Sequence, residues 1–209
     1  VYELLQQKRF SIVRSLNLHI RHELLAAQGA DLSDIREVYS HEQALGQCSK
    51  FLASLGSDVR IIPCGNTAMA AQKVAQSGRK DCAAISSHAC AELYGLSSLT
   101  GKIQDSENNY TRFICISKKP AIYAGANKIS IILTCDNEPA SLYNNLSKLA
   151  VRGINMGKLE SFPVTGRDFE FAFFIDIEAS VREPGVLGML EELENCSESI
   201  TFLGNYSVI

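Results

Sequence analysis

A hydroxyl and a guanidinium meet where a polar loop enters an apolar strand. The loop 104–110 leads through Thr111 and Arg112 into Phe113 and the apolar residues after it. An arginine in this place can bind a carboxylate through two parallel hydrogen bonds, and a threonine hydroxyl can donate a hydrogen bond or a proton to a leaving oxygen. The competing interpretation is a turn followed by an edge strand, with the arginine reaching out to solvent. The pattern itself does not choose between them.

Three further polar pairs follow predicted strands and precede predicted helices: Ser40-His41, Asn66-Thr67 and Ser86-Ser87. In an open α/β sheet, ligands bind at the carboxyl ends of the strands. Helix N-termini with free N–H groups also suit an anionic ligand. The same residue types serve as plain helix caps, and the pattern alone favours caps over a binding site.

The best-known nucleotide, hydrolase and metal signatures are missing from the sequence. It has no Walker loop, no G-x-G-x-x-G, no G-x-S-x-G and no H-E-x-x-H. The four histidines do not pair with the seven cysteines at zinc spacing, and no cysteines are spaced C-x-x-C. His19 and His22 are expected on opposite faces of one strand. Reduced thiols, mostly in the core, are therefore expected.

Composition places the chain among globular proteins. Its 209 residues are 46% hydrophobic and 21% charged, with a net charge of −3, which excludes a disordered chain and argues against a basic nucleic-acid surface. No apolar run approaches the roughly 18 residues of a membrane helix. No signal-peptide pattern is seen at the N-terminus. We expect a cytoplasmic protein that binds neither nucleic acid nor membrane.

The first half of the chain alternates between strand and helix patterns. Strands are predicted within 10–25 and at 35–39, 59–64, 81–86 and 111–117; helices are predicted at 42–55 with Ser40 as cap, from Asn66 or Thr67 to Gly78, and at 88–94. This alternation predicts an α/β layer structure with mostly parallel strands. The polar stretch between 95 and 110 is expected to be irregular.

The second half has a different order after a linker at 118–127. Its pattern is strand 128–135, helix 139–152 with Pro139 in the first turn, strands 155–164 and 169–179 around a turn, helix 183–194 and strand 199–206. This β-α-β-β-α-β order is the ferredoxin-like arrangement. At the start, Val1, Leu4 and Leu5 have helical spacing without a cap, so we expect a piece of a longer protein.

Several segments together resemble the prephenate dehydratase family. The segment 109–113, Asn-Tyr-Thr-Arg-Phe, resembles its N-x-T-R-F signature, and 38–48 resembles its V-Y-S-H-x-Q…Q-C segment. Segments 67–71 and 83–96 resemble S-T-A-x-A-A and A-A-I-G…A-x-L-Y-G-L. Near the C-terminus, 138–142 and 159–163 stand where the fused ACT regulatory domain has x-P-G-A-L and x-E-S-R-P. The resemblance covers nearly the whole chain.

The resemblance implies a two-part fold. Residues 1–121 would be the second lobe and return strand of a periplasmic-binding-protein-like (type 2) prephenate dehydratase domain, and 122–209 a ferredoxin-like βαββαβ ACT domain. The family's first lobe, with its G-P-x-G-[TS]-[FY] and P-x-E-N segments, is not in this sequence. We therefore expect a fragment that lacks lobe one and turns over substrate poorly by itself.

The resemblance also implies the chemistry. Prephenate loses its ring carboxylate and hydroxyl to give phenylpyruvate, carbon dioxide and water in L-phenylalanine biosynthesis, without a cofactor or metal because aromatisation drives the reaction. Thr111 would be the catalytic donor to the leaving hydroxyl, and Arg112 would support the site or a substrate carboxylate. The other residues implied to line the cleft are Ser40, Gln47, Asn66, Thr67 and Phe113, of which Phe113 is also a core candidate.

For the ACT part, the resemblance implies an L-phenylalanine effector site and a homodimer or homotetramer. The implied effector residues are Glu138, Pro139, Ala140, Ser141, Leu142, Glu160 and Ser161. Ala140 replaces the glycine of P-G-A-L and Phe162 the arginine of E-S-R-P, so weak binding is expected. Fusion to a chorismate mutase in a longer parent is compatible with this family. The alternatives are a non-catalytic amino-acid-sensing module and a solute-binding protein.

Overall fold

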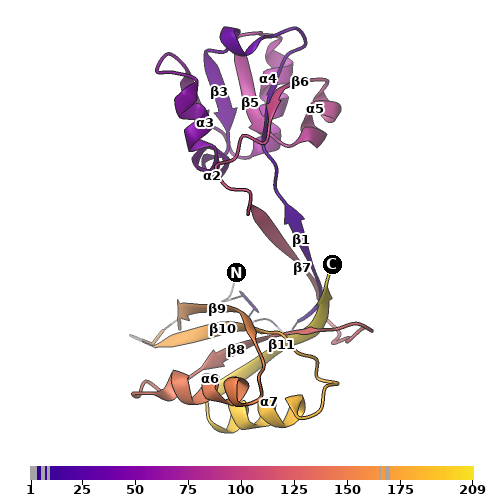
Figure 1. Cartoon of the computed structure of the whole chain (residues 1–209), viewed down its shortest axis with the longest axis vertical. Helices are drawn as coiled ribbons and strands as arrows, with labels where there is room; N and C mark the ends of the chain where they lie inside the picture. Colours follow the sequence, from indigo (N-terminus) through magenta and orange to yellow (C-terminus); the bar gives the residue numbers. More distant parts are fainter. Residues whose placement is uncertain (1–3, 6–7, 9, 165, 168–169) are drawn as a thin grey trace. The chain divides into compact units, whose positions relative to one another are not determined.

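The computed structural model describes residues 4–5, 8, 10–164, 166–167 and 170–209. Its chain divides into two compact units (Figure 1): the first unit comprises residues 18–111, and the second unit comprises 1–17 with 112–209. This division differs from the predicted boundary at 121/122. The reason is that β1 (Ser11–His19) and β7 (Tyr110–Ser117) add their strands to the sheet of the second unit.

The first unit is built on a five-stranded mixed sheet. Its order is β4 (Arg60–Pro63), β3 (Glu37–Ser40), β5 (Cys82–Ser86), β2 (Glu23–Ala26) and β6 (Ser97–Gly101). β3 pairs in parallel with β4 and β5, whereas β2 is antiparallel to β5 and β6. The prediction of a mostly parallel sheet was therefore wrong. The segment 27–36 after β2 holds only a short 3₁₀ turn, Leu32–Asp34, and not the helix of a parallel crossover.

Helices cover both faces of this sheet. Leu24 and its same-face neighbours pack under α2 (Glu42–Gln47) and α3 (Ser49–Ser54). Leu25, one residue on and so on the opposite face, packs under α4 (Thr67–Ser77) and α5 (His88–Tyr94). The two helices α4 and α5 confirm the predictions for 67–77 and 88–94, and Asn66 is the α4 cap.

Other predicted elements of the first unit need correction. The helix expected over 42–55 is two helices that meet at Cys48, whose φ of −118° and ψ of 25° are not helical. Its cap is His41, since Ser40 is the last residue of β3. The strand expected within 10–25 breaks after His19. β6 was not predicted, because its polar sequence has no alternation and it gains its order by pairing with β2.

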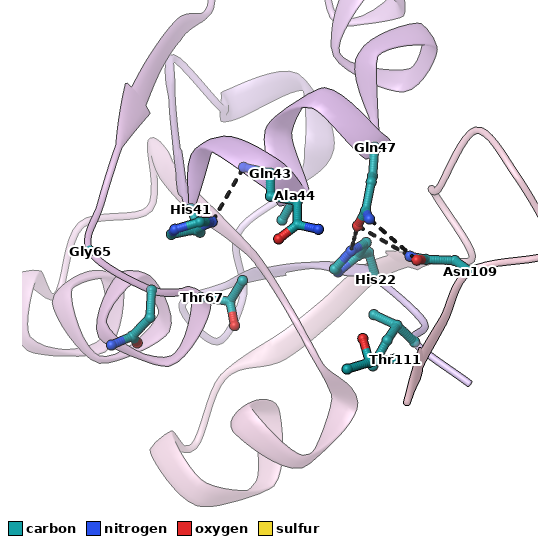
Figure 2. A pocket seen from close by; sticks show the side chains of 11 residues that line it. His22, His41, Gln43, Ala44, Gln47, Gly65, Thr67, Asn109 and Thr111 are labelled. Atoms are coloured by element: carbon teal, nitrogen blue, oxygen red, sulfur yellow. Dashed lines mark hydrogen bonds between the residues drawn. The ribbon is translucent and has the colours of Figure 1, made fainter. Parts of the chain in front are cut away.

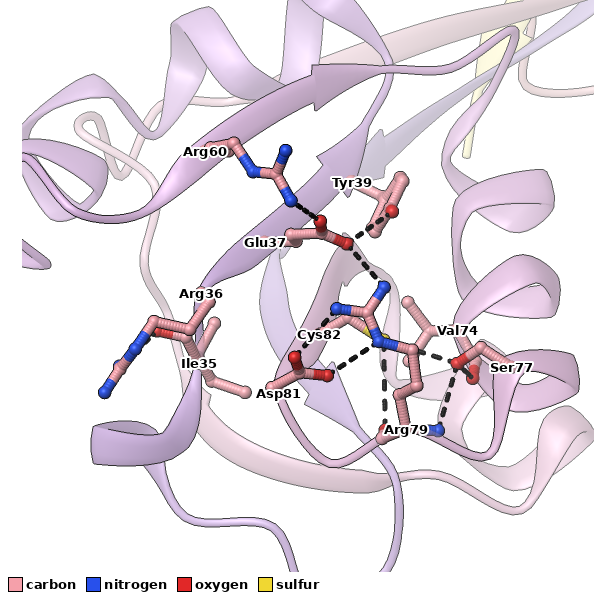
Figure 3. Close-up of polar contacts among 10 residues, drawn as sticks. All are labelled: Ile35, Arg36, Glu37, Tyr39, Arg60, Val74, Ser77, Arg79, Asp81 and Cys82. Carbon is pink, nitrogen blue, oxygen red and sulfur yellow. Dashed lines mark hydrogen bonds and ion pairs between the residues drawn. The ribbon is translucent and has the colours of Figure 1, made fainter.

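A buried carboxylate organises the amino end of the parallel strands (Figure 3). Glu37, the first residue of β3, accepts a hydrogen bond from the Tyr39 hydroxyl at 2.7 Å and from Arg79 at 2.9 Å, and it pairs with Arg60. Arg79 also bridges to Asp81 at 2.8 Å. The Tyr39 hydrogen bond, followed by the Arg79 and Arg60 charges, holds the pKa of Glu37 below 4.5 although burial opposes this. The cluster therefore ties together the starts of β3, β4 and β5.

The second unit contains the predicted β-α-β-β-α-β order. It runs β8 (Lys128–Thr134), α6 (Ser141–Val151), β9 (Met156–Pro163), β10 (Phe171–Ile177), α7 (Val186–Asn195) and β11 (Ser199–Val208). These strands pair antiparallel in the order β11-β8-β10-β9, and β1 joins the β11 edge in parallel, followed by β7. α6 and α7 pack on one face of the sheet through Leu149, Met189 and Leu193 (Figure 1).

The helix starts of the second unit fall later than predicted. α6 begins at Ser141, so Pro139 precedes the helix, and its cap Ala140 has a left-handed φ of 66°. α7 begins after Gly185, not at 183. Within the turn expected at 165–168, residues 165 and 168 lie outside the described residues, as does Val1 of the expected N-terminal helix. The linker at 118–127 contains no helix or strand, as predicted.

All seven cysteines are free. Cys48, Cys82 and Cys90 are buried as expected, but Cys115 and Cys196 are exposed. The exposed Cys115 corrects the interpretation of its apolar stretch as core, because β7 is the edge strand of the sheet. Among the described helices, none is long and apolar enough to cross a membrane.

Gly204 permits the closest backbone approach in the second unit. It lies at an irregularity of β11, with φ of 154°, and a Cβ placed on it would stand 2.1 Å from the carbonyl oxygen of Ile12 in β1. The obstacle is backbone, so no side-chain rotation can relieve it. β1 can therefore pack on β11 only because position 204 has no side chain.

We expect Glu37→Gln to flatten the acid limb of the stability profile of the first unit. A carboxyl whose folded pKa lies below its unfolded value stabilises the fold above the unfolded pKa, and this share is lost as pH falls through the folded pKa. The loss for the parent chain should begin near pH 4.5, the ordinary pKa. Urea unfolding from pH 7 to 3, with exposed Glu194→Gln as control, measures it; a parent-like acid limb in Glu37→Gln would contradict the assignment.

Gly204→Ala should destabilise the second unit by several kcal/mol, as backbone displacement and core overpacking do. The matched control is Gly188→Ala, in the exposed interior of α7 with no atom within 4 Å of the new Cβ. That change should stabilise the helix by up to about 1 kcal/mol. Thermal unfolding of both variants gives the comparison, and equal effects of the two would show that β1 does not need the close approach.

Candidate active site

A pocket of about 330 Å³ opens in the first unit (Figure 2). The pocket lies where the parallel strands β3 and β4 end and α2 and α4 begin. It is lined by Ile20, His22, His41, Gln43, Ala44, Gln47, Gly65, Asn66, Thr67, Asn109 and Thr111. The carboxyl edge of an open α/β sheet is the usual place for a ligand.

The direction of β2 brings a further part of the pocket wall to this edge. β2 is antiparallel to β5, with Glu23 opposite Ser86, so the start of β2 lies at the carboxyl end of β5. His22 immediately precedes β2. The Asn109 carbonyl accepts from the Ile20 N–H at 2.7 Å, which places the segment before Thr111 beside the segment before β2.

A reciprocal amide pair fixes one end of the pocket. Gln47 Nε2 donates to Asn109 Oδ1 at 3.2 Å, and Asn109 Nδ2 donates to Gln47 Oε1 at 3.1 Å. The His22 Nε2 lies 2.9 Å from the same Gln47 Oε1. Figure 2 shows these three side chains converging, with His41 and Thr67 toward the other side of the pocket. The pair joins the end of α2 to the loop that leads into Thr111.

The opposite end is formed by two helix starts. Asn66 Oδ1 accepts from the Met69 N–H at 2.8 Å, and His41 Nδ1 accepts from the Gln43 N–H at 3.3 Å. Both residues cap a helix and also line the pocket, so the cap interpretation is confirmed and ligand binding by these residues stays a prediction. The first turn of α4 directs N–H groups and the positive end of its dipole to this region.

The hydrogen-bond donors of the pocket include uncharged hydroxyl and amide groups. None of the lining residues is Asp, Glu, Lys or Arg, and the titratable ones are His22 and His41. The hydroxyls of Thr67 and Thr111 and the amides of Gln47 and Asn109 supply hydrogen-bond donors. No cluster of three His, Cys, Asp or Glu side chains suited to a metal ion occurs in the described part of the chain.

Cys48 follows Gln47 in sequence but is not a nucleophile. The thiol is fully buried. Burial, with a smaller contribution from Asp105, raises the pKa of the Cys48 thiol to about 12. A thiol with this pKa stays protonated at neutral pH, and only the thiolate attacks. The reactive hydroxyl candidates of the pocket are therefore the two threonines.

The structure brings most of the predicted cleft residues together. Thr111, Gln47, Asn66 and Thr67 all line the pocket. Ser40 does not, because its buried hydroxyl donates to the Ile85 carbonyl at 2.6 Å. Ser86 is also outside the lining, and its buried hydroxyl has no hydrogen-bond partner among the described residues. Phe113 belongs to the second unit, where it is 51% exposed on β7, so the structure gives it no core position.

Arg112 has its partners in the second unit. Its Nε donates to the Ser15 hydroxyl at 3.0 Å, and its terminal nitrogens bind Asp176 and Tyr206. Asp176 and Tyr206 are nearly inaccessible to solvent. The guanidinium thus already binds a protein carboxylate, and it is not among the lining residues of the pocket. A contact between Arg112 and substrate stays a prediction that this geometry does not favour.

The predicted effector residues are divided between two places in the second unit. Glu138, Ser141 and Leu142 line a smaller pocket of about 150 Å³ at the start of α6, together with Phe171 and Phe173. Asp136 and Glu170 also line it, which gives this pocket an acidic wall. Pro139 and Ala140 are adjacent but outside the lining, and Glu160 and Ser161 lie exposed on β9.

Sequence reasoning missed His22 as a residue of the main pocket. His41 was named only in the polar pair Ser40-His41, and Gln43 and Asn109 were recognised only as parts of motifs. His22 could have been recognised from its place just before the apolar run 24–26. The expectation of one continuous strand within 10–25 concealed the break between two strands, at which His22 enters the pocket wall. His41 was masked by assigning the cap to Ser40, one residue too early.

Comparison with known proteins shows which family the sequence resembles. Residues 1–121 match the family model for prephenate dehydratase. The chain is 34% identical over 219 residues to arogenate dehydratase/prephenate dehydratase 2 of Arabidopsis thaliana, covering 99% of this chain and 57% of that protein. It is 35% identical over 209 residues to a bifunctional chorismate mutase/prephenate dehydratase of Enterobacter agglomerans, covering 99% of this chain and 54% of the relative.

Among solved structures, prephenate dehydratase from Arthrobacter aurescens in complex with L-Phe matches with a TM-score of 0.85. It is 28% identical and covers 98% of this chain and 68% of that one. The chain has a mixed α/β fold that matches solved prephenate dehydratase structures, and it belongs to the prephenate dehydratase family. It spans little more than half the length of the curated relatives that it matches.

Proposed function

We propose that the pocket of the first unit binds prephenate and that Thr111 assists its conversion to phenylpyruvate in L-phenylalanine biosynthesis. The observation that carries the proposal is the Thr111 hydroxyl at the wall of a pocket that is lined by further hydroxyl, amide and imidazole groups and by no Asp, Glu, Lys or Arg. A dicarboxylate suits such a lining. Relatives named for arogenate make that compound the second substrate to assay.

The reaction requires from the protein mainly the orientation of the substrate and one hydrogen bond to the leaving oxygen. The electron pair of the bond to the ring carboxylate moves into the ring as carbon dioxide leaves. The C–O bond breaks at the opposite ring position, and the departing hydroxide takes a proton from solvent to leave as water. A neutral threonine is a weak acid, so its contribution is a hydrogen bond that strengthens as charge develops on the departing oxygen.

We further propose that the βαββαβ part of the second unit is an ACT domain that responds to L-phenylalanine. The supporting observations are its element order and the pocket at the start of α6. The acidic wall formed by Asp136, Glu138 and Glu170 suits the ammonium of an amino acid and repels its carboxylate. This balance supports weak binding. The alternative is an amino-acid sensor that does not turn over a substrate. Turnover assays for the first pocket and L-phenylalanine binding at the second pocket distinguish the two.

Thr111→Val should lower kcat by about 10²–10⁴-fold, the range for a positioned acid or hydrogen-bond donor, with KM within a few fold. Valine keeps the shape and removes the hydroxyl, so an interaction made mainly in the transition state is lost. Phenylpyruvate formation by the whole gene product that contains this chain gives the rates. Thr111→Ser is the control because it keeps a hydroxyl; a kcat of Thr111→Val within threefold of the parent would assign Thr111 a structural role.

Ala140→Gly should raise the thermal stability of the second unit and tighten L-phenylalanine binding. The left-handed φ of 66° at Ala140 costs an L-residue roughly 1–2 kcal/mol that glycine does not incur. The control Ala150→Gly, at an exposed position in the last turn of α6, should instead lower the stability by up to about 1 kcal/mol. Calorimetric titration and thermal unfolding measure both effects; unchanged L-phenylalanine affinity in Ala140→Gly would show that Cβ does not obstruct the effector.

A further inference from the structure

The burial of His22 in the pocket wall is explained neither by the family motifs nor by its position in the sequence. His22 is only 6% exposed and forms part of the pocket wall. Its backbone is held separately from its side chain, since the N–H donates to Gln104 Oε1 at 3.1 Å and the carbonyl accepts from Ile103 at 3.2 Å. These two backbone hydrogen bonds direct the imidazole at Gln47, and they should remain when the side chain is replaced.

The Gln47–Asn109 pair by itself cannot choose its own orientation. If both amide groups rotated by 180°, the pair would still contain two N–H···O hydrogen bonds. The third partner breaks this degeneracy when the imidazole proton is on Nε2. An amide oxygen only accepts, so the contact between His22 Nε2 and Gln47 Oε1 at 2.9 Å in the observed orientation requires the proton on Nε2. In the rotated pair, the Gln47 NH₂ would face that N–H donor, whereas a proton on Nδ1 would let Nε2 accept from the rotated amide, so the tautomer of His22 decides the orientation of the pair.

Orientation decides what the pocket presents to its ligand. In the observed arrangement, each amide nitrogen uses one N–H within the pair and keeps a second N–H. A rotated pair would exchange nitrogens and oxygens at both residues and replace donors by acceptors. Asn109 stands two residues before Thr111, so its placement also sets the entry of that residue into the pocket. An anionic ligand discriminates strongly between these arrangements because it needs donors.

We propose that His22 is a positioning residue, whose Nε2–H fixes the Gln47–Asn109 amide pair in the orientation that offers N–H groups to an oxyanion beside Thr111. The identity of that oxyanion rests on the proposed function. His22 acts through Gln47 and transfers no proton itself. A glutamine can replace it, because its Nε2 donates from nearly the same position as the imidazole Nε2, whereas leucine offers no donor.

The first test does not depend on activity. Nitrogen-15 NMR of this chain should show His22 protonated on Nε2, and the side-chain amide signals of Gln47 and Asn109 should shift in His22→Leu but remain near their parent positions in His22→Gln. His88→Leu, at an exposed position that pairs with Glu23, is the matched control. A neutral His22 protonated on Nδ1, or amide signals unchanged in His22→Leu, would overturn the assignment.

The second test uses turnover by the whole gene product. His22→Leu should lower kcat roughly 10–100-fold, as misplaced catalytic groups do, with KM within threefold, and His22→Gln should restore kcat to within about threefold of the parent. Equal loss in both variants would overturn the positioning role in favour of proton transfer by the imidazole. If the parent turns over neither prephenate nor arogenate, the proposed function fails, and the NMR result still decides the role of His22.

Discussion

The amide pair between Gln47 and Asn109 is the contact on which the pocket depends. It joins residues 62 positions apart in sequence, one at the end of α2 and the other in the loop that delivers Thr111. Without it, Asn109 would keep only its backbone contact with Ile20, and the loop would be held to the helices further back, where Asp105 bonds to the Gln47 carbonyl and to the Ser49 hydroxyl. The pair also gives each amide one donated and one accepted hydrogen bond in a half-buried place, where an unpaired polar group would cost roughly 1–3 kcal/mol.

The mixed sheet is the reason that these groups can meet. Parallel β3 and β4 deliver two helix starts to one edge, and antiparallel β2 delivers the segment containing His22 to the same edge. A wholly parallel sheet would bring its strand ends there but not a strand beginning. The Glu37 cluster holds the opposite end of the same strands. The ion pairs that stabilise the sheet are therefore separated from the pocket by the length of the strands.

Sequence reasoning predicted well where a single periodicity extended over a complete element. α4, with its Asn66 cap and αL stop at Gly78, and the order of the second unit are such cases. It failed where order comes from a partner: β6 is polar and exists through pairing with β2, and the bend at Cys48 divides one apolar helix pattern into two helices. The motifs were enough to select Gln47, Asn66, Thr67 and Thr111. The roles of Ser40 and Arg112 could not be judged from the sequence, because they depend on the partners Ile85 and Asp176.

The central claim is that the pocket of residues 18–111 receives the substrate at the Gln47–Asn109 end, beside Thr111. An NMR titration of prephenate into this chain tests it most directly. The account predicts that the largest shifts occur at the side-chain amides of Gln47 and Asn109 and at the backbone amides of Thr67 and Thr111. Signals of Leu142 in the smaller pocket should stay in place. Shifts confined to the second unit, or none at saturating prephenate, would contradict the account.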